Sequence, residues 1–214
     1  MLPHAVFWDM DGTLIDSEPL HDEALVVALG KLGLKPPANL HERVLGQTAQ
    51  DVYDMLRAEV GLDLAFDRWI ALKYEHYLNE ASKLKPRPGA VEIWNELKTR
   101  GIAQAVVSNS DRLIVEANIH ALGLREAGLR SVTRNDVRMG KPHAEPYLRA
   151  AWLFGIDPAN CAVMEDSLPG SESGLAAGMR TVYWPEAPGP GPAGALVAET
   201  AHDVRGFLGL QPRG

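Results

Sequence analysis

Seven side chains that could take part in chemistry stand at or just after short apolar runs of this sequence. They are carboxylates, a hydroxyl, an amide and an ammonium group. The runs "AVFWDMD", "VVSN" and "CAVMED", together with the loop "MGKP", contribute Asp9, Asp11, Ser108, Asn109, Glu165, Asp166 and Lys141. Carboxylates that are crowded together repel one another, and a bound cation is the usual means of keeping them ionised.

A cation, a lysine and a hydroxyl at one site are suited to binding a phosphoryl group. Hard oxygen ligands that are few in number and share the coordination shell with water are typical of Mg²⁺. A lysine supplies further positive charge, and a hydroxyl can donate a hydrogen bond to a phosphoryl oxygen. The residue types therefore predict a Mg²⁺ site for phosphate chemistry, provided that the strand ends meet.

The elements that must bring these residues together alternate along the chain as strand and helix. Short β-rich runs are expected at Ala5–Asp9, Ala103–Asn109, Arg130–Asp136, Cys161–Asp166 and Arg180–Trp184. All but the third are continuous apolar stretches, which are typical of parallel strands covered on both faces. The pattern predicts an α/β fold with a doubly wound, parallel, Rossmann-like sheet, in which ligands bind at the carboxyl ends of the strands.

Residues 17–85 break this alternation, because they contain helical patterns and no convincing strand. We therefore expect an inserted α-helical cap domain at residues 17–85 and a core domain formed by residues 1–16 and 86–214. The segment Pro185–Gly194 is rich in Pro and Gly. It is expected to form a surface loop before a last helix that runs from about Ala195 to Leu208.

Composition argues against several classes of function. The 214 residues include 21 basic and 28 acidic ones, and the formal net charge of −7 argues against binding to nucleic acid or to an anionic membrane surface. The first residues lack the pattern of a signal peptide, and no run approaches the roughly 20 apolar residues of a membrane span. The single cysteine, Cys161, favours a reducing compartment. We expect a soluble cytoplasmic protein, a monomer or small homo-oligomer, with no nucleic-acid or membrane partner.

Four stretches resemble, in order, the four motifs of the haloacid dehalogenase superfamily. "DMDGT" is similar to the first motif, DxDGT, and "VVSNS" to the second, an apolar strand that ends in Ser or Thr. Lys141 in "MGKPHAEPY" is similar to the third, and "VMEDSLPGSESGLAAGM" to the fourth. The resemblance covers the whole chain, and the helical insert looks like the type 1 cap of the subgroup similar to beta-phosphoglucomutase.

The resemblance implies a role for each principal residue. Asp9 would attack phosphorus as the nucleophile and form an aspartyl-phosphate. Asp11 would protonate the leaving alkoxide and then deprotonate the hydrolytic water. Lys141 and the metal would offset the negative charge on the phosphoryl oxygens.

The same resemblance implies which residues hold the metal and the substrate. The implied Mg²⁺ ligands are the carboxylates of Asp9 and Asp166, the backbone carbonyl of Asp11, and Glu165 as a further or outer-shell ligand. The implied phosphate-binding and substrate-binding residues are Gly12, Thr13, Ser108 and Asn109 of the core and His21 and Gln47 of the cap. For Asn109 a backbone turn is an equal alternative, and for His21 a solvent-facing position on a helix remains open.

The second acid of DxDGT favours phosphate ester chemistry within this superfamily. The prediction is Mg²⁺-dependent hydrolysis of a small phosphorylated metabolite, a phosphomonoester of the sugar phosphate or phosphoglycolate class. The alternative is a sugar phosphomutase of the beta-phosphoglucomutase type, although no Lys or Arg occurs from Gly46 to Asp54 to hold a second phosphate. Arg43, Arg57 or Lys73 could take that place. A non-catalytic binding domain is a third and less favoured possibility.

Overall fold

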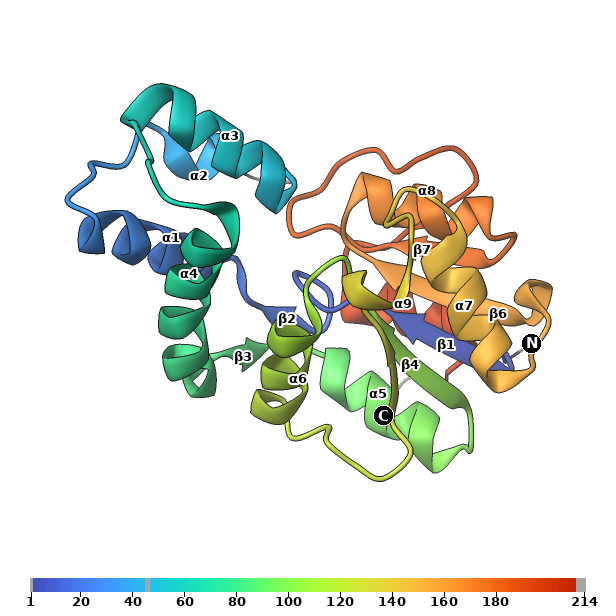
Figure 1. Ribbon diagram of the computed structural model, residues 1–214. Coiled ribbons are helices and arrows are strands. Elements are labelled where there is room, and N and C mark those ends of the chain that lie inside the picture. Colours follow the sequence, from blue (N-terminus) through green and yellow to red (C-terminus); the bar gives the residue numbers. More distant parts are fainter. Residues whose placement is uncertain (1, 45–46, 211–214) are drawn as a thin grey trace. The chain divides into compact units, whose positions relative to one another are not determined.

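The computed structural model describes residues 2–44 and 47–210, and the chain divides into two compact units (Figure 1). One unit contains Met1–Asp16 and Leu84–Gly214, and the other contains Ser17–Lys83. The second unit ends before the boundary expected at residue 85. The reason is that Lys85 pairs with Asp16 in a small antiparallel sheet of β2 (Ile15–Asp16) and β3 (Lys85–Pro86), a pairing that the sequence did not predict.

The first unit is built on a six-stranded parallel sheet. Its strands are β1 (Ala5–Trp8), β4 (Ala103–Val107), β5 (Arg130–Val132), β6 (Cys161–Glu165), β7 (Arg180–Tyr183) and β8 (Leu196–Val197). The order is β5-β4-β1-β6-β7-β8, and every neighbouring pair is parallel. The predicted doubly wound, Rossmann-like α/β fold is therefore confirmed.

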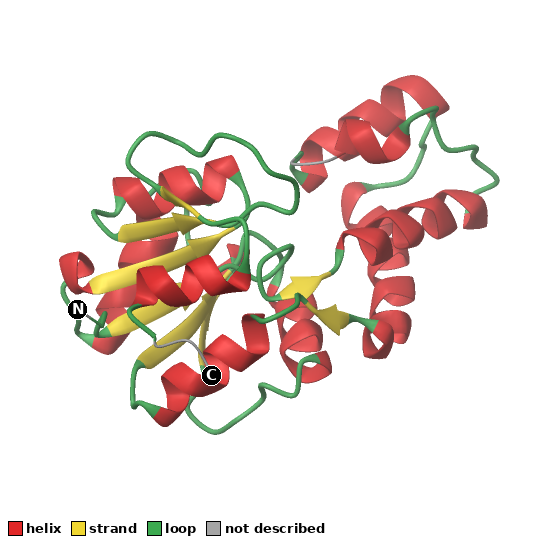
Figure 2. Cartoon of the chain, turned by 180° about the vertical axis from the view of Figure 1, so that it is seen from behind, coloured by secondary structure: helices red, strands yellow, loops and turns green. Residues whose placement is uncertain are grey.

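Helices cover both faces of this sheet (Figure 2). The helices of the unit are α5 (Ala90–Thr99), α6 (Arg112–Ala121), α7 (Glu145–Phe154), α8 (Leu168–Ala176) and α9 (Ala201–Leu208), with short 3₁₀ helices η2 (Arg134–Asp136) and η3 (Pro158–Asn160). Helices α5, α6 and α9 pack on one face, and α7 and α8 on the other. In β1, Val6 and Trp8 point to the first face and Phe7 to the second. Burial on both faces accounts for the continuous apolar runs.

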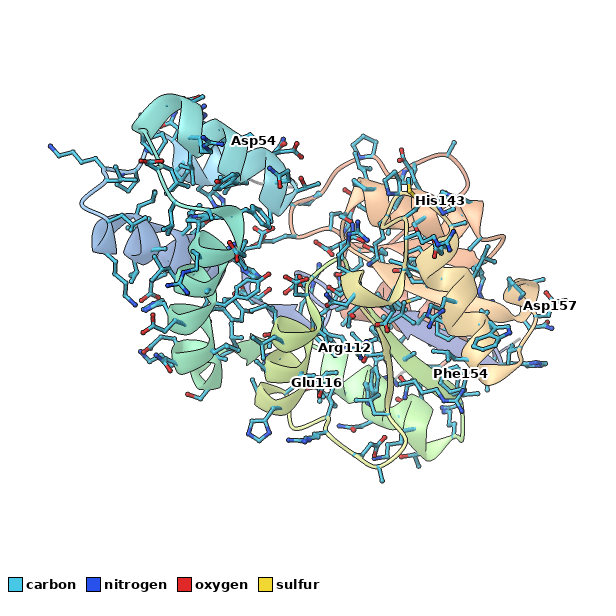
Figure 3. The ribbon with its side chains drawn as sticks, viewed as in Figure 1. Asp54, Arg112, Glu116, His143, Phe154 and Asp157 are labelled. Carbon is cyan, nitrogen blue, oxygen red and sulfur yellow. The ribbon has the colours of Figure 1, made fainter. Side chains whose placement is uncertain are left out.

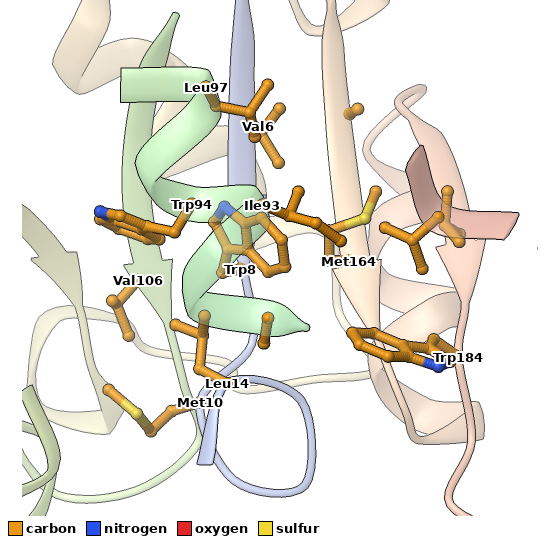
Figure 4. Close-up of a cluster of buried hydrophobic side chains, with 14 of the residues drawn as sticks. Val6, Trp8, Met10, Leu14, Ile93, Trp94, Leu97, Val106, Met164 and Trp184 are labelled. Atoms are coloured by element: carbon orange, nitrogen blue, oxygen red, sulfur yellow. The ribbon is translucent and has the colours of Figure 1, made fainter. Parts of the chain in front are cut away.

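The core between β1 and α5 fixes the strand that carries the first acidic motif (Figure 4). The rings of Trp8 and Trp94 lie 6.1 Å apart. The indole N–H of Trp8 donates to Gln104 Oε1 at 3.0 Å, and Gln104 Nε2 donates in turn to the carbonyl of Trp94 at 3.0 Å. Because its indole N–H is paired, the large side chain of Trp8 is buried at this position without an unsatisfied donor.

The end of the chain differs from the prediction of one helix from about Ala195 to Leu208. Leu196–Val197 form β8, which pairs in parallel with β7, and α9 begins only at Ala201. The start of α9 is fixed by a capping box in which Thr200 Oγ1 accepts from the backbone N–H of Asp203, and Asp203 accepts from the backbone N–H of Thr200. The Thr-x-x-Asp spacing of Thr200 and Asp203 is visible in the sequence and marks the start of α9.

The second unit is helical, as the predicted insert requires. Its helices are α1 (Glu18–Lys31), α2 (Leu40–Val44), α3 (Ala49–Val60) and α4 (Phe66–Glu80), followed by the 3₁₀ helix η1 (Ala81–Lys83). Leu29 and Leu56 meet around Trp69 in a separate apolar cluster. The described residues of this unit contain no strand. Within residues 2–44 and 47–210, no helix combines the length and apolar character needed to cross a membrane.

Candidate active site

The carboxyl ends of three adjacent strands bring the predicted side chains to one edge of the sheet. Asp9 follows β1, Ser108 follows β4, and Glu165 is the last residue of β6. These residues share one edge because β1 lies between β4 and β6 and all three run parallel. After β1 the chain forms β4 and β5 on one side of that strand, and then β6, β7 and β8 on its other side. In doubly wound folds that arrangement opens a binding crevice at this edge.

Lys141 lies between two of the carboxylates. Its Nζ is 2.5 Å from Asp9 Oδ1 and 2.5 Å from Glu165 Oε1, and it donates to the carbonyl of Val107 at 2.8 Å. An ammonium group has three N–H donors, so these acceptors match its capacity. The Lys141 side chain is 4% exposed, so its charge interacts with the carboxylates almost out of contact with water. The lysine of the third motif is thereby fixed against β1, β4 and β6.

Burial and charge repulsion shift the ionisation of this cluster. Burial and the negative charge of Glu165 raise the pKa of Asp9 well above its usual value. Burial and Glu165 also raise the pKa of Asp166 to about 7. Burial would lower the pKa of Lys141, but the charges of Asp9 and Glu165 outweigh it, and the pKa of this lysine lies above its usual value. One ammonium group does not balance the neighbouring carboxylates, so further positive charge would stabilise them.

Asp9, Glu165 and Asp166 form an acidic cluster that could hold a metal ion. Each offers one carboxylate oxygen, and these oxygens lie within 4.8 Å of one another. A set of oxygen donors with excess negative charge fits a hard divalent cation. The residues present therefore fit the cation that the motifs imply. The side chain of Asp11 does not belong to this cluster, and a metal contact through its backbone carbonyl stays a prediction.

Glu165 is fully buried, and its carboxylate is held from several sides. Oε1 accepts from the hydroxyl of Tyr147 at 2.6 Å, and Oε2 accepts from Ser167 Oγ at 3.1 Å. Burial and the charge of Glu165 raise the pKa of Tyr147, which keeps the phenol protonated as a donor. The sequence did not predict Tyr147, because a tyrosine on the apolar face of a helix is explained equally well by packing.

Gly170, in the first turn of α8, lies against the carboxylate of Glu165. A Cβ added at Gly170 would lie 2.0 Å from Glu165 Cδ, so the carboxylate or the helix would have to move. We expect Gly170→Ala to lower the free energy of unfolding by roughly 1–3 kcal/mol, as overpacking of a buried site does. Activity should fall as well, because Glu165 shifts away from Lys141. Thermal unfolding and hydrolysis rates measure the two effects.

Gly206 provides the matched control for this substitution. It lies in α9, and a Cβ added there would meet nothing within 4 Å. Gly206→Ala should therefore raise the free energy of unfolding by roughly 0.5–1 kcal/mol, the usual gain from replacing a glycine inside a helix. A stabilising effect of the same size from Gly170→Ala would contradict the close contact with Glu165.

Asp166 is oriented by the loop that follows β1. Thr13 Oγ1 donates to Asp166 Oδ1 at 2.7 Å. Gly12 has a φ of 81°, and a Cβ there would lie 2.3 Å from Asp166 Oδ2, so both the backbone and the space require glycine. Arg87 holds the same loop by donating from Nη1 to the carbonyl of Gly12 at 2.7 Å while its guanidinium stacks on Trp184. The predicted contacts of Gly12 and Thr13 with phosphate remain predictions.

Asp11 accepts hydrogen bonds from three side chains of the segment that follows β4. Its Oδ2 accepts from Ser110 Oγ at 2.7 Å and from Ser108 Oγ at 3.3 Å, and its Oδ1 accepts from Asn118 Nδ2 at 3.1 Å. Ser108, which was predicted to bind phosphate, thus also reaches the second acid of the first motif. Ser110 and Asn118 were not predicted, because their proximity to Asp11 follows from the packing of α6 beside β1 and β4.

Asn109 pairs with the backbone of Lys141. Its Oδ1 accepts from the N–H of Lys141 at 2.9 Å, and its Nδ2 donates to the carbonyl of Lys141 at 3.2 Å. A Cβ added at Gly140 would lie 2.6 Å from Asn109 Oδ1, which explains a glycine directly before the lysine. These contacts favour the structural alternative for Asn109, in which it positions the loop that carries Lys141.

The two predicted cap residues lie in the unit Ser17–Lys83. His21 is in α1, where its ring stacks on that of Tyr77 at a centroid distance of 4.4 Å. Gln47 is exposed between α2 and α3, and its backbone N–H donates to the carbonyl of Val44 at 3.0 Å. Gly46, where the stretch without Lys or Arg begins, lies outside the described residues. The substrate contacts of His21 and Gln47 remain predictions.

Comparison with known proteins gives relatives along almost the whole chain. A family model described as haloacid dehalogenase-like hydrolase matches residues 3–178. The chain is 31% identical over 188 residues to the bifunctional riboflavin kinase/FMN phosphatase of Arabidopsis thaliana, a match that covers 87% of this chain and 50% of that protein. The chain therefore spans about half the length of that relative.

One further relative and one solved structure match over most of both chains. Hexitol phosphatase A of Escherichia coli is 30% identical over 179 residues, which cover 82% of this chain and 80% of that protein. The crystal structure of CbbY from Rhodobacter sphaeroides in complex with phosphate matches with a TM-score of 0.87 at 23% identity and covers 98% of this chain and 100% of that one. At this identity the structural match shows the fold alone.

Proposed function

The chain belongs to the haloacid dehalogenase-like hydrolase family, and we propose that it is a phosphatase that hydrolyses small phosphomonoesters through an aspartyl-phosphate formed on Asp9. The observation that carries this proposal is the convergence of Asp9 and Lys141 beside an acidic cluster at the carboxyl end of the central strand β1. A carboxylate held there can act as a nucleophile toward a phosphoryl group bound at this edge of the sheet.

In this proposal the two acids of the first motif divide the work. Asp9 attacks phosphorus with a carboxylate oxygen, and Lys141 offsets negative charge on the phosphoryl oxygens. Asp11 carries the proton, first to the leaving alkoxide and then from the attacking water. The separation of their hydrogen-bond partners supports this division, because Asp9 is bound to an ammonium group while Asp11 is bound to two hydroxyls and an amide.

We further propose that Mg²⁺ is the cation of the acidic cluster. Asp9, Asp166 and Glu165 would hold it, with the backbone carbonyl of Asp11 as a further ligand. When bound, it would supply positive charge to the phosphoryl oxygens. The raised pKa values of Asp9 and Asp166, which burial and Glu165 cause, support the need for such charge.

Removal of divalent metal is expected to abolish activity. Dialysis against EDTA should stop the hydrolysis of p-nitrophenyl phosphate, and added Mg²⁺ should restore it, because Lys141 alone leaves the carboxylates uncompensated. Ca²⁺ should inhibit, since it takes about six to eight loosely arranged oxygen ligands instead of a tight octahedral set. The absorbance of released nitrophenol measures the loss in EDTA, the recovery with Mg²⁺ and the inhibition by Ca²⁺. Full activity in EDTA would contradict the proposed metal site.

The substrate class that we propose is a sugar phosphate or a similar small phosphorylated metabolite such as phosphoglycolate. The similarity to a hexitol phosphatase supports the sugar phosphate class. The helical unit of residues 17–83 would act as the cap that selects the substrate, with His21 and Gln47 as candidate contacts. The single cysteine, Cys161, supports a cytoplasmic location, because a chain that can form no intrachain disulfide is typical of a reducing compartment.

The phosphomutase alternative needs a cation of the cap to hold a second phosphate. All three candidates, Arg43, Arg57 and Lys73, already take part in interactions of their own. Arg43 forms an ion pair with Glu59, and the guanidinium of Arg57 lies over the ring of Tyr53 at 5.7 Å. These contacts favour hydrolysis, because each cation would have to give up its partner to bind phosphate.

A panel of phosphorylated metabolites tests the proposed function. Purified protein with Mg²⁺ should release inorganic phosphate from one or more sugar phosphates. Conversion of a sugar 1-phosphate to its 6-phosphate without phosphate release would show a mutase instead. Absence of turnover with every ester of the panel, including p-nitrophenyl phosphate, would show a non-catalytic domain. Phosphate release and sugar products are measured in the same samples, so each outcome is distinct.

A further inference from the structure

Asn118 is a polar residue on the buried face of a helix that is otherwise apolar there. Helix α6 begins at Arg112, which Figure 3 labels together with Glu116. Its other buried residues are Ile114, Val115 and Ile119, while Asn118 is 0% exposed. Burial of a primary amide is unfavourable unless its polar atoms are hydrogen-bonded, so an apolar residue would suit this position better if packing were its only role.

The amide of Asn118 reaches the carboxylate that the proposed reaction uses as a proton carrier. Asn118 Nδ2 donates to Asp11 Oδ1 at 3.1 Å, and the hydroxyls of Ser110 and Ser108 donate to Asp11 Oδ2. The donors differ in kind. A hydroxyl can rotate to serve another acceptor, whereas an amide nitrogen only donates, and this one is fixed to a regular helix.

The three donors also differ in the demands that a substrate would make on them. Ser108 follows β4 and is the residue of the second motif that is expected to bind phosphoryl oxygens. Its 3.3 Å contact with Asp11 is the longest of the three, so it is the contact most easily given up to a phosphate. Asn118 belongs to none of the four motifs and lies on the buried face of α6. It can therefore keep hold of Asp11 while a substrate is bound.

We propose that Asn118 is a positioning residue for the proposed hydrolysis, and that its buried amide fixes Oδ1 of Asp11 so that the carboxyl group is aimed for proton transfer. This inference rests on the proposed function, in which Asp11 carries the proton. Without the amide, the side chain of Asp11 would rotate about its own bonds and would occupy the productive orientation for a smaller fraction of the time. The nucleophile, Asp9, has separate partners and keeps its place.

The replacement Asn118→Leu tests this assignment, because leucine fills a similar volume and donates no hydrogen bond. The probes are glycerol 2-phosphate, whose alkoxide needs a proton to leave, and p-nitrophenyl phosphate, whose phenolate does not. With rapid mixing and saturating Mg²⁺, phosphorylation of Asp9 by glycerol 2-phosphate should slow by about 10-fold or more. The upper limit is the roughly 10²–10⁴-fold that general acid–base catalysis supplies. Phosphorylation of Asp9 by p-nitrophenyl phosphate, followed as the first release of nitrophenol, should keep its rate.

Val115→Ala is the matched control on the same helix. Val115 is fully buried in the core and carries no polar atom. Its truncation should lower thermal stability but should not separate the two esters. If Val115→Ala slows glycerol 2-phosphate selectively, the effect arises from the helix and the proposal is overturned. If Asn118→Leu does not fold, the smaller Asn118→Ala takes its place in the same comparison.

A double-mutant cycle with Asp11→Asn separates positioning from a purely structural role. If Asn118 acts through Asp11, its replacement in the Asp11→Asn background should cause no further loss with glycerol 2-phosphate. Equal and additive losses with both esters would show a structural role and overturn the proposal, as would unchanged rates in Asn118→Leu. If Asp11→Asn itself fails to distinguish the esters, the division of labour in the proposed function fails, and this inference fails with it.

Discussion

Asp9→Asn is expected to form no phosphoenzyme and to turn over phosphate esters at less than about 10⁻⁴ of the wild-type rate. The amide oxygen is neutral and is a poor nucleophile toward phosphorus, so neither a sugar phosphate nor p-nitrophenyl phosphate should be attacked. The loss should thus be independent of the leaving group. Intact-mass spectrometry of protein quenched after rapid mixing detects the adduct, which should be present in the wild type and absent in the variant.

The fold of Asp9→Asn should remain intact. Lys141 keeps Glu165 and the carbonyl of Val107 as acceptors. Burial and the charge of Glu165 raise the pKa of Asp9, which means that folding disfavours its ionised form at neutral pH. In EDTA the neutral amide should therefore unfold at a temperature no lower than the wild type. A phosphoenzyme in the folded variant would rule out Asp9 as the nucleophile.

The residues that could be predicted from the sequence are those whose position depends on local features. Asp9 and Glu165 lie where apolar runs end, and a parallel sheet brings such ends together whatever the details of packing. Lys141 lies on a loop, and its predicted place rested on the resemblance to the third motif. The structure shows the physical basis, since Asn109 binds its backbone and the carboxylates bind its ammonium group.

Two of the residues that could not be predicted are polar side chains inside helices. Asn118 and Tyr147 each occupy an apolar face, and their partners, Asp11 and Glu165, are distant in the sequence. No helical or strand periodicity identifies such pairs, because they depend on how α6 and α7 pack against the sheet. The short strand β8 was missed for a related reason, because its two residues are recognisable as a strand only through their pairing with β7.

Asp11→Asn is expected to fail in a different way from Asp9→Asn. It keeps the nucleophile and the acidic cluster with Lys141, but an amide can neither give up a proton to an alkoxide nor accept one from water. General acid–base catalysis contributes roughly 10²–10⁴-fold, or about 3–5 kcal/mol of barrier. With a sugar phosphate the variant should lose that factor in the first step, because an alkoxide leaves slowly without a proton.

With p-nitrophenyl phosphate the same variant should still be phosphorylated on Asp9, since nitrophenolate leaves unaided. The second step still needs a base to activate water, so the phosphoenzyme should accumulate. One equivalent of nitrophenol should then appear as a burst before slow turnover, and the adduct should be visible by intact mass. Asp9→Asn is the control for the burst, and thermal unfolding with and without Mg²⁺ is the control for the fold and the metal site.

The burst decides between two explanations of why two acids follow β1. If Asp11 carries only the proton, removing its charge leaves the first step intact for an activated ester, and Asp9 is trapped as the phosphoenzyme. If Asp11 instead supports Asp9 or the metal, the first step fails for every ester, and neither burst nor adduct appears. The contacts favour the first explanation, because Asp11 is bound by Ser108, Ser110 and Asn118, while Asp9 is bound by Lys141. A folded, Mg²⁺-binding Asp11→Asn protein that gives no burst would therefore refute the assignment of the proton carrier.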